Sequence, residues 1–207
     1  MSAGIRGLYA ITPCDADGRA RLEFVEAVLR GGARVLQYRD KTTDHARRSG
    51  EAAGLRSLCR DYAARLIIND DVALAKEVGA HGVHLGDDDG SLERAREILG
   101  PDCLIGASCY NRLDRAEAAV AAGADYVAFG RFFVSTTKPD AVAAPPALLA
   151  EARERLRVPI VAIGGITADN GAALCQAGAD ALAVINGVFA LADPEAAARR
   201  IAALFAP

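Results

Sequence analysis

The chain has 207 residues, of which 52% are hydrophobic and 25% are charged, and its formal net charge is −3. The apolar fraction is too high for a disordered chain, so we expect a single packed domain over residues 1–207. The slightly negative charge provides no field that would attract a nucleic-acid backbone, so nucleic acid is not an expected partner and any polyanionic ligand must be held locally.

Short apolar runs alternate with alanine-rich stretches along the whole chain. Eight runs are short enough for strands and rich in Val, Ile, Leu or Tyr, and they cover residues 8–12, 35–38, 66–69, 82–85, 104–108, 126–130, 160–163 and 181–185. The composition between and after them favours helices, at residues 22–30, 46–64, 72–78, 92–99, 113–122, 147–156, 172–177 and 194–205.

A Gly-Ala pair precedes every second run, with its glycine at Gly32, Gly79, Gly123 or Gly178. Each glycine follows an expected helix, where a left-handed residue commonly ends the helix. Strands that alternate with helices pair in parallel, and eight βα units of about 26 residues each fit a compact (β/α)8 TIM barrel. A doubly wound open sheet is the alternative, but the glycine-rich dinucleotide turn is missing after the first run.

The chemistry of a parallel barrel lies in the loops that follow its strands. Gln37, Arg39 and Lys41 end the second run at alternate positions, so their side chains can point the same way. An amide, a guanidinium and an ammonium group together suit a polyanion. An ordinary solvated strand end, whose cations pair with Asp40 or Asp44, explains the same pattern.

Carboxylates follow the third and fourth runs. Asp70 and Asp89, at neighbouring strand ends, suit a hard divalent ion such as Mg²⁺ shared with phosphate oxygens. The neighbouring aspartates have a purely structural explanation. Asp71 can be the N-cap of the helix at 72–78, and Asp87 or Asp88 can be a turn residue without a ligand role. We therefore expect one metal ligand in each loop.

Hydroxyl groups follow the fifth and sixth runs. Ser108 ends the fifth run, and the next loop carries three hydroxyls and an ammonium group, a plausible cradle for phosphate. These residues are Ser135, Thr136, Thr137 and Lys138.

Small residues end the seventh and eighth runs, with Gly164 and Gly165 in one loop and Asn186 and Gly187 in the other. Barrels of this kind often bind phosphate between these two loops, although a tight turn explains each pair equally well. Two anion sites are thus expected, and cations combined with a metal suit a departing diphosphate better than a phosphate monoester.

Taken in order, these residues resemble the thiamine-phosphate synthase family. The matching motifs are Q-x-R-x-K at 37–41, N-D-D at 69–71, G-V-H-L-G at 82–86 with Asp89, G-A-S at 106–108, S-T-T-K at 135–138 and G-G-I-T at 164–167. The resemblance covers nearly the whole chain. It implies a transferase that condenses 4-amino-2-methyl-5-(diphosphooxymethyl)pyrimidine with 4-methyl-5-(2-phosphooxyethyl)thiazole, giving thiamine monophosphate and diphosphate with the help of Mg²⁺.

The resemblance also assigns site residues. Contacts to the pyrimidine diphosphate fall on Gln37, Tyr38, Arg39, Asp40, Lys41, Asn69, Ser108 and Lys138. Contacts to the thiazole phosphate fall on Ser135, Thr136, Thr137, Gly165, Ile185 and Asn186. The Mg²⁺ ligands are Asp70 and Asp89, and the residues expected to act in catalysis are Arg39, Lys41, Ser108 and Lys138.

The chain departs from the family pattern at a few positions. Ser135 replaces the usual Thr and Asn186 a common Ser, and both keep a polar side chain. Asp87 stands where many relatives carry Gln, and its charge would either tighten the metal or compete with Asp89 for it.

Two other functions are open at this stage. A thiazole tautomerase shares the barrel but uses acid–base chemistry, and in that subfamily a His follows the serine of the fifth strand, where this chain has Cys109. We expect Cys109 to be a buried structural thiol and His84 to have a structural role. A non-catalytic barrel that binds phosphorylated ligands is the second alternative, but it would have no reason to keep so many charged residues together.

The five cysteines are scattered and lack the spacing of a disulfide framework or a zinc site, which indicates a reduced, cytoplasmic setting. We find no signal-like apolar segment, and charged residues interrupt the long apolar runs, so no membrane association is expected. The expected partners are the two phosphorylated substrates. The resemblance also allows for a second copy of the chain, since relatives often form dimers.

Overall fold

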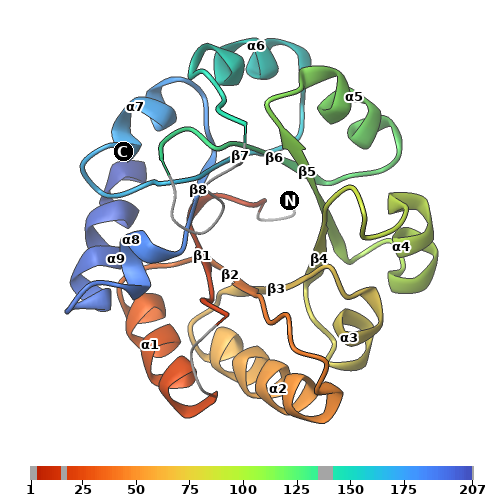
Figure 1. Cartoon of the computed structure of the whole chain (residues 1–207), viewed down its shortest axis with the longest axis vertical. Coiled ribbons are helices and arrows are strands. Elements are labelled where there is room, and N and C mark those ends of the chain that lie inside the picture. The colour runs from red at the N-terminus through yellow and green to blue at the C-terminus, as the bar shows by residue number, and fades with distance from the viewer. Residues whose placement is uncertain (1–3, 15–17, 135–141, 207) are drawn as a thin grey trace.

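Eight parallel strands form a closed barrel surrounded by helices in this computed structural model, which describes residues 4–14, 18–134 and 142–206 (Figure 1). The strands are β1 (Gly7–Ile11), β2 (Val35–Tyr38), β3 (Arg65–Asn69), β4 (Gly82–Leu85), β5 (Leu104–Tyr110), β6 (Tyr126–Phe129), β7 (Ile160–Ile163) and β8 (Ala181–Val184). Each strand pairs with the next, and β1 pairs with β8. The predicted (β/α)8 barrel is therefore confirmed, and the open sheet is excluded.

The helices follow the strands in the predicted alternation. They are α1 (Gly18–Arg30), α2 (His45–Asp61), α3 (Val72–Glu77), α4 (Leu92–Leu99), α5 (Leu113–Ala121), α6 (Ala147–Arg155), α7 (Gly171–Gln176), α8 (Asn186–Phe189) and α9 (Pro194–Ala202), with a 3₁₀ turn at Ala203–Phe205. The short α8 was not among the predicted helices. None of the helices in the described ranges is long and apolar enough to cross a lipid bilayer.

Strand β5 runs two residues further than predicted. It continues to Tyr110 because an irregularity in its pairing with β6, between Ser108 and Tyr110, lets Tyr110 pair with Phe129. Tyr110 has a left-handed φ of 54°, so the chain turns sharply where the strand ends at the mouth of the barrel.

Alternation of side chains along the strands produces two hydrophobic cores. One face of each strand packs against the helices, and the other fills the inside of the barrel. The inner core comprises Ile5, Tyr9, Ile11, Val35, Ile67, Tyr126, Ala128, Val161, Ala181 and Ala183. The phenolic hydroxyls of Tyr9 and Tyr126 bring polar groups into this interior.

The glycines of the Gly-Ala pairs have φ values of 103°, 61°, 95° and 113° for Gly32, Gly79, Gly123 and Gly178. These angles confirm the left-handed residues that the repeat predicts after alternate helices.

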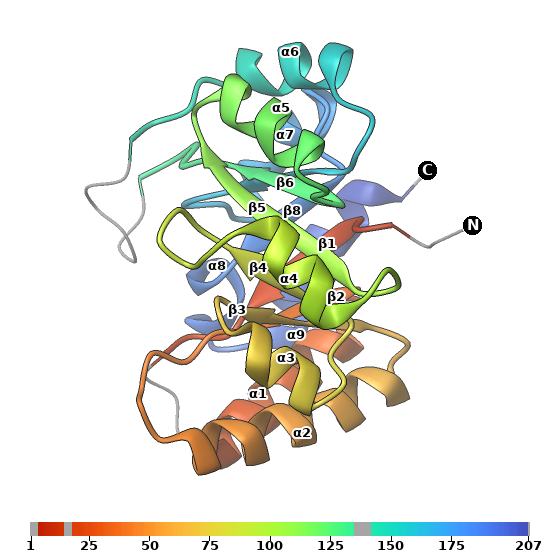
Figure 2. The same ribbon diagram turned by 90° about the vertical axis from the view of Figure 1, so that its right-hand side faces the viewer.

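In the side view, the loop from β2 to α2 and the short α8 lie at the left, and the C-terminal end of the chain lies at the right (Figure 2).

Candidate active site

A cavity of about 600 Å³ opens at the carboxyl ends of the strands. It brings together seven residues that the sequence assigned to the site. These are Gln37, Arg39, Asn69, Ser108, Gly165, Ile185 and Asn186. Because they come from β2, β3, β5 and the loops after β7 and β8, the closed barrel is what places them around one space.

Arg39 is the cation that lines this cavity from the end of β2. Its backbone N–H donates to Thr12 Oγ1 over 2.9 Å, and its guanidinium contacts Cys14 Sγ. Among the described residues, no carboxylate forms an ion pair with Arg39. A half-buried guanidinium without an anionic partner is suited to bind the anionic part of a ligand.

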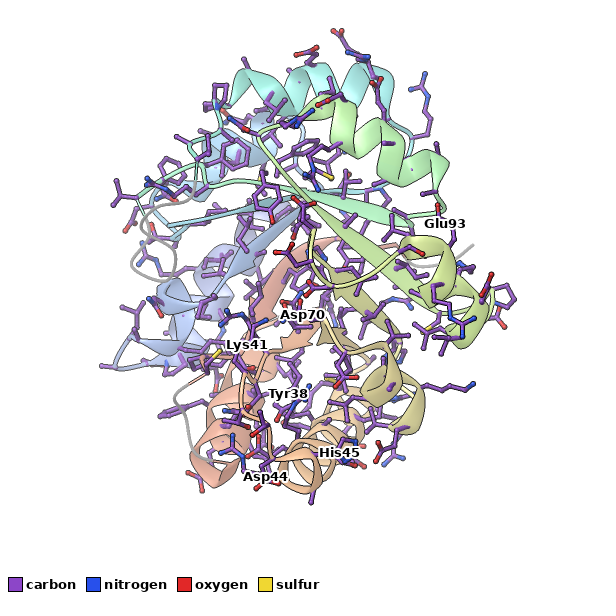
Figure 3. All side chains as sticks on the ribbon, turned by 45° about the vertical axis from the view of Figure 1, so that its right-hand side comes forward. Tyr38, Lys41, Asp44, His45, Asp70 and Glu93 are labelled. Atoms are coloured by element: carbon purple, nitrogen blue, oxygen red, sulfur yellow. The ribbon has the colours of Figure 1, made fainter. Side chains whose placement is uncertain are left out.

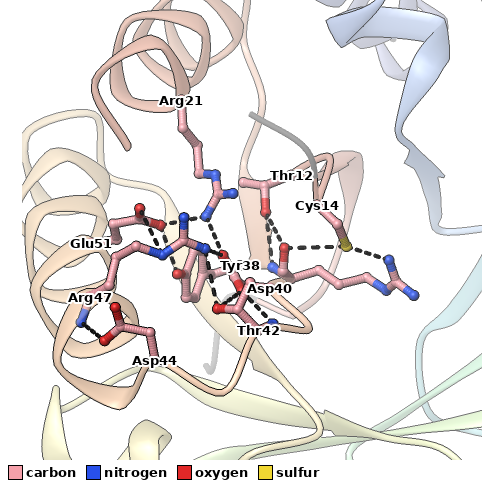
Figure 4. A network of polar contacts seen from close by, with 10 residues as sticks. Thr12, Cys14, Arg21, Tyr38, Asp40, Thr42, Asp44, Arg47 and Glu51 are labelled. Carbon is pink, nitrogen blue, oxygen red and sulfur yellow. Dashed lines mark hydrogen bonds and ion pairs between the residues drawn. The ribbon is translucent and has the colours of Figure 1, made fainter. Parts of the chain in front are cut away.

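Tyr38 and Asp40 face away from the cavity, as strand alternation requires. The Tyr38 hydroxyl donates to Glu51 over 2.8 Å, and Arg21 donates to Asp40 over 3.1 Å (Figure 4). The side chains of Arg21 and Asp40 are 1% and 0% exposed. Neither Tyr38 nor Asp40 lines the cavity, so we expect both to support the loop rather than to touch a ligand.

The electrostatics of this buried cluster favour the charged carboxylate of Asp40. Burial alone would raise the pKa of Asp40, but hydrogen bonds from Thr42 and Arg21 outweigh burial and lower the pKa to about 2. The cluster thus fixes the residue between Arg39 and Lys41 in an ionised state.

Lys41 and Asp70 form an ion pair beside the cavity (Figure 3). Asp89 lies next to Asp70, and its Oδ2 accepts a hydrogen bond from Gly86 N over 2.7 Å. Burial and the adjacent Asp70 raise the pKa of Asp89. The two negative carboxylates repel each other, and a hard divalent cation bound between their oxygens would remove this repulsion. These residues therefore fit the predicted metal.

No group of three or more His, Cys, Asp or Glu side chains able to hold a metal occurs within the described ranges. A cation at Asp70 and Asp89 would therefore need further oxygens from a ligand or from water. Asp71 is not part of this pair: it accepts from Leu74 N over 2.9 Å at the start of α3. The prediction that Asp71 is an N-cap is confirmed.

Asp87 is paired with Arg115 of α5. The same guanidinium lies over the Tyr110 ring, 5.3 Å from its centroid. Arg115 thus compensates the extra negative charge that sequence reasoning placed beside the metal loop. No motif pointed to Arg115, because it lies 28 residues after Asp87 in the chain.

The glycine pair after β7 is required by a close approach of two loops. Gly164 and Gly165 have φ values of 104° and 64°. A Cβ at Gly164 would lie 2.3 Å from Arg131 Cβ, and one at Gly165 would lie 2.3 Å from the carbonyl oxygen of Val134. These loops pack on each other at the cavity wall, so the pair does more than make a turn.

The predicted phosphate cradle of Ser135, Thr136, Thr137 and Lys138 lies outside the described residues. Its contacts to the thiazole phosphate, and the role of Lys138, stay predictions. Val134, the last described residue before this segment in the chain, lines the cavity.

Sequence reasoning missed the polar interior of the barrel. Tyr9 and His84 line the cavity, and the Tyr126 hydroxyl is hydrogen-bonded to both. The sequence offered one signal for this polar interior, namely that these three polar side chains occupy inward positions of otherwise apolar strands. Cys109, by contrast, is 1% exposed, and burial raises its pKa to about 12, as expected for a structural thiol.

Comparison with known proteins gives consistent matches. The family model described as "Thiamine monophosphate synthase" matches residues 8–188. A thiamine-phosphate synthase of Thioalkalivibrio sulfidiphilus is 60% identical over 205 residues, covering 97% of this chain and 96% of the relative. One from an Azoarcus species is 57% identical and covers 100% of both chains.

A solved structure matches as well. The thiamine phosphate pyrophosphorylase of Pyrococcus furiosus superposes with a TM-score of 0.87 at 34% identity, covering 96% of this chain and 94% of that protein. The sequence and structural matches agree.

Proposed function

Since this chain belongs to the thiamine monophosphate synthase family, we propose that it joins the pyrimidine diphosphate to the thiazole phosphate in thiamine biosynthesis. The products are thiamine monophosphate and inorganic diphosphate. The structural observation that carries this proposal is the cavity itself. It is lined by Arg39, which has no carboxylate partner among the described residues, and by Asn69, whose chain neighbour Asp70 lies next to Asp89.

The reaction breaks the bond between the pyrimidine methylene carbon and a diphosphate oxygen, and both electrons leave with the diphosphate. The electron-rich aminopyrimidine stabilises the positive charge that develops on the methylene carbon. The thiazole nitrogen then forms the new C–N bond with its lone pair. No proton is removed, so the protein needs no general base, which agrees with the buried state of Cys109.

The residues around the cavity bind, orient and stabilise charge. Arg39 would bind the diphosphate oxygens and stabilise the charge that grows on them as the bond breaks. Lys41, and by resemblance Lys138, would add positive charge on the same side. Gln37 and Asn69 offer amide groups to the aminopyrimidine, and orientation of the two substrates supplies much of the rate enhancement.

Asp70 and Asp89 are the residues that would hold Mg²⁺. When bound, Mg²⁺ supplies positive charge to the oxygens of the leaving diphosphate. The ion pair from Lys41 to Asp70 supports this assignment, because that carboxylate already attracts a cation in the protein alone.

We also propose a cytoplasmic location. All five cysteines are free thiols, as expected in a reducing compartment. Fractionation of the source cells, with activity measured in each fraction, tests this proposal.

The decisive experiment incubates the purified protein with both substrates, with Mg²⁺ and with excess chelator, and measures diphosphate and thiamine monophosphate. We expect the two products in equal amounts and only with metal. Isomerisation of a thiazole phosphate without metal would instead indicate a tautomerase, and binding without turnover a non-catalytic barrel. Either result would overturn the proposal.

A further inference from the structure

A chain of hydrogen-bonded side chains crosses the inside of the barrel and ends at the cavity. Gln37 Nε2 donates to the Tyr9 hydroxyl over 2.8 Å, which lies 3.0 Å from the Tyr126 hydroxyl. The Tyr126 hydroxyl is 3.1 Å from His84 Nδ1. His84 Nε2 is 2.9 Å from Ser108 Oγ. Five strands, β1, β2, β4, β5 and β6, each contribute one member.

The two tyrosines in this chain are neutral donors. Tyr9 and Tyr126 are 1% and 0% exposed, and burial is the main cause that raises the pKa of both phenols. Each phenol therefore keeps its proton and has one hydrogen to donate and oxygen lone pairs to accept.

The donors can be followed from one end to the other. Tyr9 accepts from Gln37, so the Tyr126 hydroxyl is the partner that remains for its own proton among the described residues. Tyr126 then accepts from Tyr9 and donates to His84 Nδ1. The opposite direction would leave the Tyr9 proton without an acceptor in a buried site, which costs free energy.

This direction determines the tautomer of His84. If Nδ1 accepts from Tyr126, the neutral imidazole carries its proton on Nε2 and donates it to Ser108 Oγ. The serine oxygen then accepts this hydrogen bond with one of its lone pairs. Its own proton is free to point into the cavity.

We infer that Tyr9, Tyr126 and His84 are positioning residues that hold Ser108 as a hydrogen-bond donor toward an acceptor atom, a ring nitrogen or a diphosphate oxygen, of the bound pyrimidine diphosphate. The identity of the ligand rests on the proposed function, whereas the direction of the hydrogen bonds does not. Without the relay, a serine and a neutral histidine can exchange donor and acceptor roles. The Tyr126 hydroxyl removes this ambiguity.

The first test measures the tautomer directly, by nitrogen NMR of the full-length protein with labelled histidine. The chain has three histidines, and the signal of His84 is assigned by its loss in His84→Gln. We expect a protonated Nε2 and an unprotonated Nδ1. A proton on Nδ1 would reverse the chain of donors and overturn the inference, whether or not the protein is active.

The second test measures binding of the pyrimidine diphosphate by calorimetry in a double-mutant cycle. Tyr126→Phe keeps the ring and removes only the hydroxyl, and we expect it to weaken binding about tenfold, the scale of one hydrogen bond. In a Ser108→Ala background the same change should alter binding by less than about twofold, because the relay acts through the serine. Binding of the thiazole phosphate should not change.

Tyr62→Phe is the matched control. Its hydroxyl bonds to Glu26 over 3.0 Å, away from the cavity, and removing it should leave both affinities unchanged. Equal losses from Tyr126→Phe with and without Ser108 would mean a general packing role and overturn the inference. If Tyr126→Phe does not fold, Tyr9→Phe interrupts the same chain one step earlier. A wild-type protein that binds no pyrimidine diphosphate would contradict the proposed function. The NMR measurement of the His84 tautomer would still test the direction of the hydrogen bonds from Tyr9 to Ser108.

Discussion

Side-chain alternation along β2 places the charge of Arg39 where the proposed reaction needs it. Its neighbours Tyr38 and Asp40 face the helices, so Arg39 faces the barrel mouth. Because no carboxylate among the described residues pairs with Arg39, its charge is available to the departing diphosphate.

We predict that Arg39→Ala lowers kcat by about a hundredfold, the scale found for one preorganised donor at a developing anion. Steady-state assays with both substrates saturating measure this. Arg34→Ala, an exposed residue just before β2, serves as the control and should keep full turnover. Near-normal kcat for Arg39→Ala would remove this residue from the proposed mechanism.

A buried ion cluster behind β2 connects the loop after this strand to helices α1 and α2. Arg21 of α1 joins Asp40 of the β2 loop and Glu51 of α2 (Figure 4), so one side chain ties two helices to the loop that carries Arg39 and Lys41. Removing Arg21 would leave the buried carboxylate of Asp40 with Arg47, whose side chain is 37% exposed, and so would weaken the compensation of its charge.

Arg21→Met should therefore reduce the free energy of unfolding by about 3 kcal/mol, and it should lower turnover because the loop loses its anchor. Urea denaturation measures the first effect and steady-state assays the second. Arg30→Met tests an arginine on the same helix that is 48% exposed and paired with Glu195, and it should cost less than about 1 kcal/mol. Similar losses for the two variants would show that the cluster contributes no more than a surface pair.

The link between β3 and β4 is sensitive to pH. His81 Nδ1 accepts from Leu66 N over 2.8 Å, which requires the neutral ring. Burial, with the charges of Arg56 and Arg65, lowers the pKa of His81 to about 4. The unfolded chain, with a pKa of about 6.5, binds this proton first, so stability present above about pH 6.5 is lost as the pH falls toward 4.

We expect this histidine to lower the free energy of unfolding by about 1 kcal/mol between about pH 7 and pH 4.5, a value reduced because the ring is only half buried. Urea denaturation of the wild type and of His81→Gln at both pH values isolates the effect. The wild type should lose stability relative to the variant on acidification. Parallel profiles would mean that His81 titrates alike in both states.

The barrel as a whole was predictable because each βα unit repeats the same local signals. Strand length, helix composition and the Gly-Ala turn are readable from neighbours in sequence. The inward direction of Gln37 and Arg39 followed from alternation alone. The same alternation places Tyr38 and Asp40 on the other face, whereas family resemblance assigned them to the substrate.

Contacts that depend on closure of the barrel could not be predicted. The hydrogen bond between Tyr9 and Tyr126 joins residues 117 positions apart, and Arg115 reaches Asp87 from a later unit. Each partner is an ordinary residue in its own segment. Only the completed ring of strands determines which of them meet.

Gly106 illustrates how the closed barrel constrains a single position. It lies on β5 opposite Tyr126, and a Cβ there would be 2.0 Å from Cζ and 2.4 Å from the hydroxyl oxygen of that ring. The Tyr126 ring is fully buried and held by hydrogen bonds to Tyr9 and His84. An added methyl group must therefore displace this buried, hydrogen-bonded ring or strain the inner core around it.

Gly106→Ala should consequently lower the free energy of unfolding by about 2 kcal/mol and Tm by about 5 °C, as overpacking does in chains of this size. Calorimetry measures both.

Gly50→Ala is the control, since a Cβ at this position of α2 meets nothing within 4 Å, and alanine should stabilise the helix by up to about 1 kcal/mol. Combining Gly106→Ala with Tyr126→Leu should recover part of the loss, because the smaller side chain vacates the space that the new methyl group needs. If Gly106→Ala were as stable as the wild type, the inner core would accommodate an added methyl group. Packing would then not hold the Tyr126 ring in one position, and the inferred direction of its hydrogen bonds would rest on the hydrogen bonds alone.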